Sequence, residues 1–300
     1  MLDVSIVIVN YNTAEYLKES IESILSSDIS LSQIEVIVVD NASSDLSVKK
    51  LEDFISLNSI SLPIKIIIND DNLGFSKSVN IGIGQSRANY ICILNPDTNI
   101  MSNCLSGLID YMNSNPDIDA ITPKILNSDG SFQNSCKRSE PGILNSIYRI
   151  LGFDKIFPNS RHFASFHLLY LNENKISQVE VISGAFMFLR SSTIEKVGLF
   201  DENFYLYCED TDYCVRINNL GGKIVYYPLL KAIHHRGKSA ESRPFDVIFY
   251  LHSSMIKYYN KYQNNYKFWK FLKPVILFSI IVRKYLFYFK LVVKKFFKIK

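Results

Sequence analysis

Four short polar segments interrupt the first third of the chain, and each of them follows an apolar run. They are Asn10-Tyr11-Asn12, Asp40-Asn41-Ala42-Ser43, Asn69-Asp70-Asp71-Asn72 and Asn95-Pro96-Asp97. Their carboxylates can bind a divalent cation through oxygen, and Asp40 can accept a hydrogen bond from the imide N–H of uracil or thymine. An ordinary turn or a helix cap explains any single segment equally well. Four such segments together favour a ligand site.

The stretch "YLYCEDTDYCVR" (205–216) holds the densest acidic cluster, with Glu209, Asp210 and Asp212 at the start of a predicted helix. The helix dipole stabilises carboxylates in a first turn, and that is one explanation. The other is catalytic, because aromatic neighbours bury these groups partly and burial raises a carboxyl pKa towards the range of a general base. We favour the catalytic explanation.

Two further segments carry groups that bind anions or metals. "AIHHRGKS" (232–239) places two histidines ahead of Arg236 and Lys238, which suits a metal or a pyrophosphate, although structural histidines are more frequent. "NLGFSKSVNIGI" (72–83) places Gly74 before a helix, whose N-terminus either binds phosphate or packs closely against other backbone. This segment lacks the fingerprints of dinucleotide sites and phosphate loops.

Alternating strands and helices must position these segments. Apolar runs predict strands at 4–9, 34–39, 64–68 and 90–94, and helical spacing predicts helices at about 16–25, 44–57 and 76–86. This alternation predicts βαβ units in a mostly parallel sheet, which binds ligands beyond the carboxyl ends of its strands. The later sequence predicts a turn at 127–130, strands at 181–189 and 223–227, and helices at 191–197 and 244–262.

The composition indicates a globular protein of a reducing compartment. The 300 residues are 47% hydrophobic with only 9 Pro and 12 Gly, which argues against a disordered chain. The five cysteines form no close pair, as is typical of free thiols. The apolar run at 4–9 is too short for a signal peptide and has no basic residue before it, so we expect a cytoplasmic protein.

The charge is distributed unevenly along the chain. From Lys257 onward there are twelve Lys or Arg and no acidic residue, whereas the first 256 residues hold 21 basic and 29 acidic groups. At helical spacing the cations after Pro274 share an arc of about 140° beside large apolar residues, which is typical of a helix lying in a membrane interface. Arg283 and Lys284 make spanning marginal, and the many apolar residues disfavour nucleic-acid binding.

These segments resemble family 2 of the nucleotide-sugar glycosyltransferases, and most closely its rhamnosyltransferase-like branch of bacterial surface-polysaccharide synthesis. The resemblance covers about residues 4–239, and its longest block is "SGAFMFLRSSTIEKVGLFDENFYLYCEDTDYCVRINNLGGKIVYYPLLKAIHHRGKS". It implies a GT-A fold, which is an α/β fold with a mostly parallel nucleotide-binding sheet flanked by helices. It also implies an inverting transfer from a dTDP- or UDP-sugar, foremost dTDP-rhamnose, to a saccharide acceptor that is expected to be lipid-linked.

The resemblance assigns roles by position. "NPD" takes the place of the family's DxD motif, so Asp97 would hold Mg²⁺ or Mn²⁺ on the donor diphosphate. His234, in the H-x-x-G-x-S pattern that ends at Ser239, would lie beside this metal, and Asp210 matches the catalytic base. The expected donor-binding residues are Asn10, Tyr11, Asn12, Asp40, Gly74, Asn80 and Asn95. The acceptor-side candidates are Gly184, Asp201, Glu202 and Glu209.

Two departures from the family pattern keep rival functions open. Asn95 replaces the first DxD carboxylate, and Val79 stands where many members carry a polar or basic residue. Asn95 favours a non-catalytic, membrane-tethered binding protein that keeps the fold, whereas the intact acidic cluster disfavours it. A sugar nucleotidyltransferase is the second rival, but its glycine-rich loop with Arg is absent after residues 4–9.

The expected organisation is a catalytic domain at 1–262 followed by a basic amphipathic tail at 263–300. The tail is expected to attach the enzyme peripherally to anionic lipid on the cytoplasmic face of the inner membrane. No nucleic-acid partner is expected.

Overall fold

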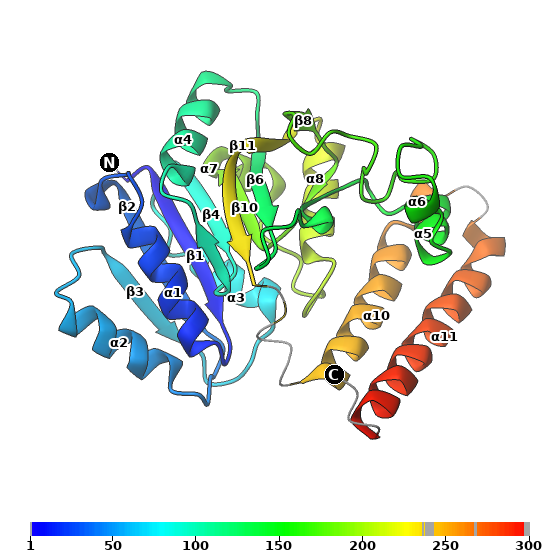
Figure 1. Cartoon of the computed structure of the whole chain (residues 1–300), viewed down its shortest axis with the longest axis horizontal. Coiled ribbons are helices and arrows are strands. Elements are labelled where there is room, and N and C mark those ends of the chain that lie inside the picture. Colours follow the sequence, from blue (N-terminus) through cyan, green and yellow to red (C-terminus); the bar gives the residue numbers. More distant parts are fainter. Residues whose placement is uncertain (1, 236, 238–242, 267–268, 297–300) are drawn as a thin grey trace.

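A nine-stranded mixed sheet runs through the molecule, and helices pack against it (Figure 1). The computed structural model describes residues 2–235, 237, 243–266 and 269–296. One half of the sheet is formed by the strands of the first 94 residues, and the other half by the strands that follow them in the chain.

The N-terminal half is the parallel sheet that the sequence predicts. Its strands are β1 (Val4–Asn10), β2 (Ile34–Asp40), β3 (Ile64–Ile68) and β4 (Tyr90–Leu94), in the spatial order β3-β2-β1-β4. The helices between them are α1 (Ala14–Leu25), α2 (Ser47–Leu57) and α3 (Phe75–Ile83). All seven residues of β1 are buried, because a central parallel strand is covered on both faces, and its β-branched side chains suit that position.

The second half of the sheet is mixed. β10 (Phe186–Arg190) runs antiparallel to β4 and to β6 (Ala120–Leu126). β11 (Ile224–His234) pairs in parallel with β6 and antiparallel with β5 (Thr98–Ile100) and β8 (Ser177–Gln178). The helices here are α4 (Cys104–Ser114), α7 (Ser191–Val197) and α8 (Glu209–Asn219). The predicted parallel sheet is thus part of a larger mixed sheet, because hydrophobic patterns do not reveal strand direction.

The single strand predicted at 181–189 is wrong, because the segment forms two strands. β9 (Val181–Ile182) pairs with β7 (Lys137–Arg138) in a separate two-stranded sheet, and β10 belongs to the main sheet. At the break between them, the Gly184 N–H donates to Asp210 Oδ2 at 3.1 Å. Continuous hydrophobicity hid this break, since both strands are buried.

Other predicted boundaries shift for local reasons. α2 begins at Ser47 rather than at residue 44, because Leu46 adopts a left-handed conformation with φ 63°. The Asp45 carboxylate accepts the Ser47 N–H at 3.1 Å and so replaces a missing helical bond. The predicted turn at 127–130 is present, and the Gly130 N–H closes it. Single 3-10 turns lie at Leu31–Gln33, Asn134–Cys136 and Gln263–Asn265.

Four helices gather at one end of the molecule, and α10 and α11 lie side by side there (Figure 1). They are α5 (Ile143–Ile150), α6 (Phe153–Ile156), α10 (Pro244–Lys261) and α11 (Trp269–Phe296). A second hydrophobic cluster joins Phe204 and Val215 to Trp269 and Ile280 of α11. The segment predicted as a tail therefore begins inside a packed cluster rather than as a free appendage.

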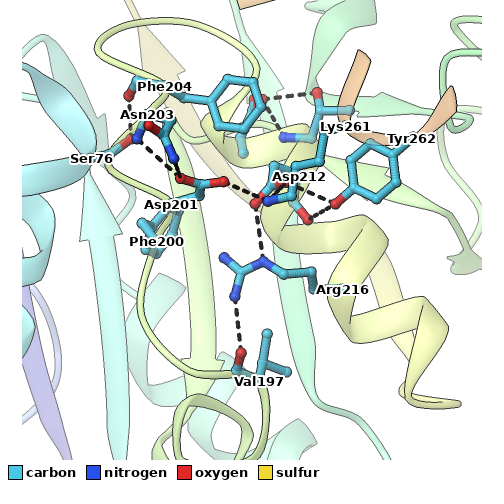
Figure 2. Close-up of polar contacts among 12 residues, drawn as sticks. Ser76, Val197, Phe200, Asp201, Asn203, Phe204, Asp212, Arg216, Lys261 and Tyr262 are labelled. Carbon is cyan, nitrogen blue, oxygen red and sulfur yellow. Dashed lines mark hydrogen bonds and ion pairs between the residues drawn. The ribbon is translucent and has the colours of Figure 1, made fainter. Parts of the chain in front are cut away.

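A buried ionic network fastens the end of α10 to α8 (Figure 2). Asp212 is fully buried. Its carboxylate accepts from Lys261 Nζ at 2.5 Å, Tyr262 Oη at 2.7 Å and Arg216 Nε at 3.0 Å. Lys261 also reaches Asp201 at 2.6 Å. These donors offset the desolvation of the Asp212 carboxylate, which would otherwise disfavour folding.

The helices of the described part of the chain include none that is both long and apolar enough to cross a membrane. α11 contains Pro274 and exposes large apolar side chains along its length. They are Phe271, Val275, Phe278, Ile281, Val282, Tyr285, Leu286, Phe289, Val292 and Phe296. Attachment of the 263–300 segment to a membrane surface stays a prediction.

Candidate active site

One large cleft, with a volume of about 1070 Å³, opens where the predicted strand ends meet. Tyr11, Asn41, Asn72 and Asp97 line it, and each comes from a different one of the four polar segments. This convergence follows from the parallel order of β3, β2, β1 and β4, whose carboxyl ends share one edge. The opposite walls come from α8, from α10 and α11, and from the chain between β7 and α6.

Strand pairing places Asp97 beside His234. β5 and β11 pair with Thr98 opposite His234, and the His235 N–H donates to the Asp97 carbonyl at 2.8 Å. This contact exists because β11 continues the strand predicted at 223–227 as far as His234. As a result, Asp97 Oδ1 lies 3.2 Å from His234 Nε2, and the two side chains are 5% and 10% exposed.

A hydrogen-bond chain orients the imidazole of His234. Gln133 Nε2 donates to Asn127 Oδ1 at 3.0 Å, so the Gln133 carbonyl oxygen faces His234 Nδ1 at 2.9 Å. Nδ1 therefore carries a proton, and Nε2 is the nitrogen that would bind a cation shared with Asp97. Their separation of 3.2 Å fits a shared cation, because adjacent ligands about 2.1 Å from one octahedral ion are about 3 Å apart.

Asp97 and His234 are the residues that could hold Mg²⁺ or Mn²⁺. Asn95 Nδ2 lies 3.4 Å from His234 Nε2, so the amide at the first DxD position contacts the imidazole. Within the described ranges, no group of three or more His, Cys, Asp or Glu is placed to bind a metal. The pair therefore fits a cation that takes its other ligands from a substrate diphosphate and from water, as Mg²⁺ commonly does.

Asp210 faces the cleft from the first turn of α8. Its Oδ2 accepts from Arg138 Nη2 at 2.6 Å and from the Gly184 N–H at 3.1 Å. Its Oδ1 accepts from the Thr211 N–H at 2.6 Å and from the Thr211 hydroxyl at 3.1 Å. The carboxylate is thus oriented by three segments of the chain. Because the Thr211 hydroxyl can rotate, a substrate hydroxyl can take its place on Oδ1.

The turn before α8 is strained. Tyr207 and Cys208 have φ 69° and 66° although neither is glycine, which costs about 1–2 kcal/mol each. This turn directs Glu209 and Asp210 to the cleft wall. Glu209 Oε2 is buried and has no hydrogen-bond partner among the described residues. Burial and the neighbouring Asp210 raise the pKa of Glu209 to about 8, so Glu209 carries a proton at neutral pH and is poorly placed to accept another.

The helix N-terminus at Gly74 packs against protein. Gly74 has φ 84°, and a Cβ there would lie 2.5 Å from Tyr205 Cδ2. The Phe75 N–H donates to the Tyr205 carbonyl at 2.7 Å, and the Ser76 hydroxyl donates to the Phe204 carbonyl at 2.6 Å. Gly74 does line the cleft. Close packing, which was the alternative explanation of this motif, accounts for the glycine, and these groups are not available to a phosphate.

Asp40 and Asn10 bond to each other rather than to the cleft. Asp40 Oδ1 accepts from Asn10 Nδ2 at 2.7 Å and from the Ser43 hydroxyl at 2.6 Å, and Oδ2 accepts the Ser43 N–H at 2.9 Å. Both side chains are buried. The turn explanation therefore accounts for Asp40. The neighbouring Tyr11 and Asn41 line the cleft instead.

Four other candidates lie outside the cleft wall, namely Asn12, Asn80, Asp201 and Glu202. Asn12 accepts the Ser44 N–H at 2.7 Å. Asn80 Nδ2 donates to the Phe200 carbonyl at 2.9 Å and to Glu202 Oε1 at 3.0 Å. Asp201 belongs to the Lys261 network. These contacts connect separate segments of the fold, and none of the four residues lines the cleft.

The two histidines have different surroundings. His235 Nδ1 lies 2.9 Å from the Ser128 hydroxyl, and its ring lies 5.6 Å from that of Tyr16. Unlike His234, it does not line the cleft. Gly237 does line it, but Arg236, Lys238 and Ser239 of the predicted loop lie outside the described residues.

Three residues at the site were missed by sequence reasoning. Arg138 and Gln133, which contact Asp210 and His234, come from the irregular stretch where neither helical nor strand periodicity is present. Arg243, just before α10, places its guanidinium 4.0 Å from the centre of the Tyr11 ring. No local pattern signals these contacts, because each one joins segments that are far apart in the chain.

Residues 5–175 match the family described as "Glycosyl transferase family 2". Rhamnosyltransferase WbbL of Escherichia coli is 27% identical over 81% of this chain and 88% of its own length. The N-acetylglucosaminyl-diphospho-decaprenol L-rhamnosyltransferase of Mycobacterium tuberculosis is 25% identical over 60% of this chain, and the match spans only 62% of that relative.

The fold is shared with a solved glycosyltransferase structure. Mannosyltransferase PcManGT from Pyrobaculum calidifontis, in complex with GDP-Man and Mn²⁺, superimposes with a TM-score of 0.61 at 15% identity, over 94% of this chain and 70% of that chain. The family match covers more than half of the chain, and the architecture agrees with it. The chain therefore belongs to glycosyl transferase family 2, has a GT-A-type fold and counts rhamnosyltransferases among its relatives.

Proposed function

We propose that this protein is an inverting, metal-dependent glycosyltransferase that moves a sugar from a nucleoside diphosphate to a saccharide hydroxyl. The observation that carries the proposal is the shared cleft, which Asp97 and His234 line on one wall and Asp210 on another. Its volume of about 1070 Å³ is at the upper end of the usual range for ligand pockets. Such a cleft has room for a nucleotide sugar and an acceptor sugar together.

Asp210 is the proposed general base. The acceptor oxygen forms a bond to the anomeric carbon while the bond from that carbon to the diphosphate oxygen breaks, and the configuration inverts. The hydroxyl proton passes to the Asp210 carboxylate, which Arg138 and the Gly184 N–H hold in position. Glu209, already protonated, shapes the wall beside it.

Asp97 and His234 would hold Mg²⁺ or Mn²⁺ against the donor diphosphate. A bound divalent cation neutralises the charge that develops on the leaving diphosphate. Tyr11, Asn41 and Asn72 line the neighbouring part of the cleft, beside the ends of β1, β2 and β3, and we assign the nucleoside to that part. Asp40 and Asn10 would not contact the nucleoside but would hold the loop after β2 in place through their hydrogen bonds to Ser43.

The donor is proposed to be a dTDP- or UDP-sugar, with dTDP-rhamnose foremost, because rhamnosyltransferases are among the relatives. A panel of dTDP-, UDP- and GDP-sugars, incubated with and without Mn²⁺, would be assayed for nucleoside diphosphate release. We expect one donor to stand out and to require Mn²⁺. Release of pyrophosphate would indicate a nucleotidyltransferase. Tight donor binding without any release would indicate the non-catalytic alternative.

The acceptor is proposed to be lipid-linked, and the 263–300 segment to attach the 1–262 catalytic domain to the cytoplasmic face of the inner membrane. The exposed apolar side chains of α11 and its many cations support this proposal. Each near-surface Lys or Arg contributes about 1 kcal/mol of attraction to anionic lipid. Binding to the membrane surface should therefore weaken with salt.

Membrane attachment is testable without removing α11, whose Trp269 and Ile280 are buried. Replacing the exposed Phe271, Phe278 and Phe289 by Ser should release the protein from anionic vesicles and leave its melting temperature nearly unchanged. Unaltered sedimentation of this triple variant with phosphatidylglycerol vesicles would mean that α11 is not the attachment site.

A further inference from the structure

The cleft extends past Asp210 to side chains of α5, α6 and α11, which form what we call its far end. Both cationic and apolar side chains line the far end, namely Arg149, Ile150, Lys155, Arg283, Leu286, Phe287 and Lys290. The stretch 244–300 contains a single acidic residue, Asp246, which lies in the first turn of α10. Asp246 also lines the cleft, but Arg149, Lys155, Arg283 and Lys290 leave the far end with an excess of positive charge.

Arg283 of α11 is one of the cations that line the far end of the cleft. It is half-buried, and burial lowers the pKa of its guanidinium. Its Nη1 lies 3.3 Å from Met255 Sδ, and its guanidinium lies 5.1 Å from the centre of the Phe287 ring. No carboxylate of the described residues forms an ion pair with it. An arginine stays charged under these conditions, so it is a partly desolvated cation that lacks a counter-ion.

A second arginine approaches the same point from the other wall. Arg283 contacts Met255 of α10, and one helical turn later the same face of α10 carries the buried Tyr259 with its hydroxyl. That hydroxyl donates to Ser146 Oγ at 3.0 Å. Arg149 also stacks on Phe166 at 4.4 Å. Arg149 lies one turn after Ser146 on the same face of α5, so the two guanidinium groups and the Ser146 hydroxyl, which Tyr259 holds in place, form a donor set suited to phosphate oxygens.

Apolar surface flanks this donor set on both sides. On one side, α5 and α6 with the residues beside them expose Leu144, Ile147, Ile150, Leu151, Ile156 and Phe157. On the other side, α11 exposes the apolar side chains described above. A small soluble anion needs no such surroundings, whereas the phosphate of an amphiphile does, because its hydrocarbon must also leave water.

We propose that Ser146, Arg149, Tyr259 and Arg283, the arginine pocket, bind the phosphate or diphosphate group of a lipid-linked acceptor. The hydrocarbon chain lies against the exposed apolar surface of α5–α6 and α11, and the saccharide extends along the cleft towards Asp210. This inference rests on the proposed function, since it gives the acceptor of that reaction its place.

Binding of farnesyl diphosphate to the full-length chain is the direct test. Arg283→Met and Arg149→Met should each weaken its binding about 10- to 100-fold, as expected for the loss of a charge-assisted hydrogen bond. Lys270→Met is the matched control, because Lys270 is exposed on the same helix outside the cleft, and it should change binding less than twofold. Farnesol, which lacks the phosphates, should bind all four proteins equally.

Further measurements separate the competing outcomes. Wild-type binding of farnesyl diphosphate by both arginine variants, with melting temperatures unchanged, would overturn the proposal. An equal loss of binding to phosphatidylglycerol vesicles would also overturn it, because the arginines would then serve general lipid adsorption. Donor turnover separates the proposed transferase activity from the proposed acceptor site. If the wild type releases nucleoside diphosphate while both arginine variants bind farnesyl diphosphate as the wild type does, the proposed activity stands and only the arginine pocket is wrong.

Discussion

Asp210 and Asp212 occupy the same helical turn of α8, but Asp210 lines the cleft and Asp212 is buried in the fold. Two residues along a helix correspond to a rotation of about 200°, so the two side chains point to opposite faces. Asp210 faces the cleft and pairs with Arg138. Asp212 is fully buried among Arg216, Lys261 and Tyr262, where it fastens α10 (Figure 2). Residue type and local sequence are nearly identical, so the face of the helix decides between chemistry and stability.

The neighbouring acidic residues are likewise divided between the cleft wall and the buried ionic network. Glu209 lies with Asp210 on the cleft wall, whereas Asp201 shares Lys261 with Asp212. The acidic cluster seen in the sequence is therefore two clusters. One is proposed to act on substrate, and the other holds the helical end of the molecule on the sheet domain.

The largest expected effect comes from the carboxylate of the proposed metal pair. Asp97→Ala should lower turnover by at least about a thousandfold, since stabilisation of the leaving diphosphate is lost. Mn²⁺-dependent binding of nucleoside diphosphate, measured by calorimetry, should disappear with it. The neighbouring imidazole provides the control, because His235→Ala should keep Mn²⁺-dependent binding. Retained Mn²⁺-dependent affinity in Asp97→Ala would remove Asp97 from the metal site.

Asp212→Ala should have the opposite signature. Removing one partner of a fully buried ion pair typically costs about 3–5 kcal/mol, and we expect the lower end of that range because the Lys261 and Arg216 side chains are 34% and 22% exposed. Urea unfolding should show this loss in the free energy of unfolding, while nucleotide affinity below the transition stays unchanged. Asp201→Ala, which removes only the more exposed end of the network, is expected to cost less. Equal costs would mean that Asp212 is not the centre of the network.

Glu209 gives a pH-dependent prediction. Its pKa is raised to about 8 in the folded state, whereas an unfolded glutamate titrates near 4.3. Between these values the folded state binds more protons, so stability is fully present at low pH and falls as the pH rises. Of the order of 3 kcal/mol should be lost between pH 5 and 7.5, and Glu209→Gln should flatten this dependence. An equally steep profile in Glu209→Gln would assign the titration to another group.

The smallest effect concerns Arg243, which stacks on Tyr11 at the proposed nucleoside end of the cleft. Cation–π contacts contribute about 0.5–2 kcal/mol. Arg243→Gln should therefore weaken nucleoside diphosphate binding roughly 2- to 30-fold without changing its Mn²⁺ dependence. Identical affinity would show that this contact does not extend to the bound nucleotide.

Local sequence predicted most of the parallel half of the fold and the segments that meet at the cleft. Hydrophobic runs and strand-end polar residues report on burial and turns, which are local properties. The strand break at Gly184 and the contacts of Arg138 and Gln133 were not predictable in this way. They depend on which distant segments pack together. For the same reason Asn80 and Asp40 were expected at the donor, although their contacts are structural.

The comparison between the two aspartates is tested most directly by making Asp210→Asn and Asp212→Asn in parallel. Turnover of the preferred donor and free energy of unfolding would be measured for each. Asp210→Asn should lose about a hundred- to ten-thousandfold in turnover and little donor affinity, because the base acts on the acceptor. Asp212→Asn should keep turnover within a few-fold and lose stability. Near-normal turnover in Asp210→Asn, or a larger loss of turnover in Asp212→Asn, would contradict the assignment of Asp210 as the base.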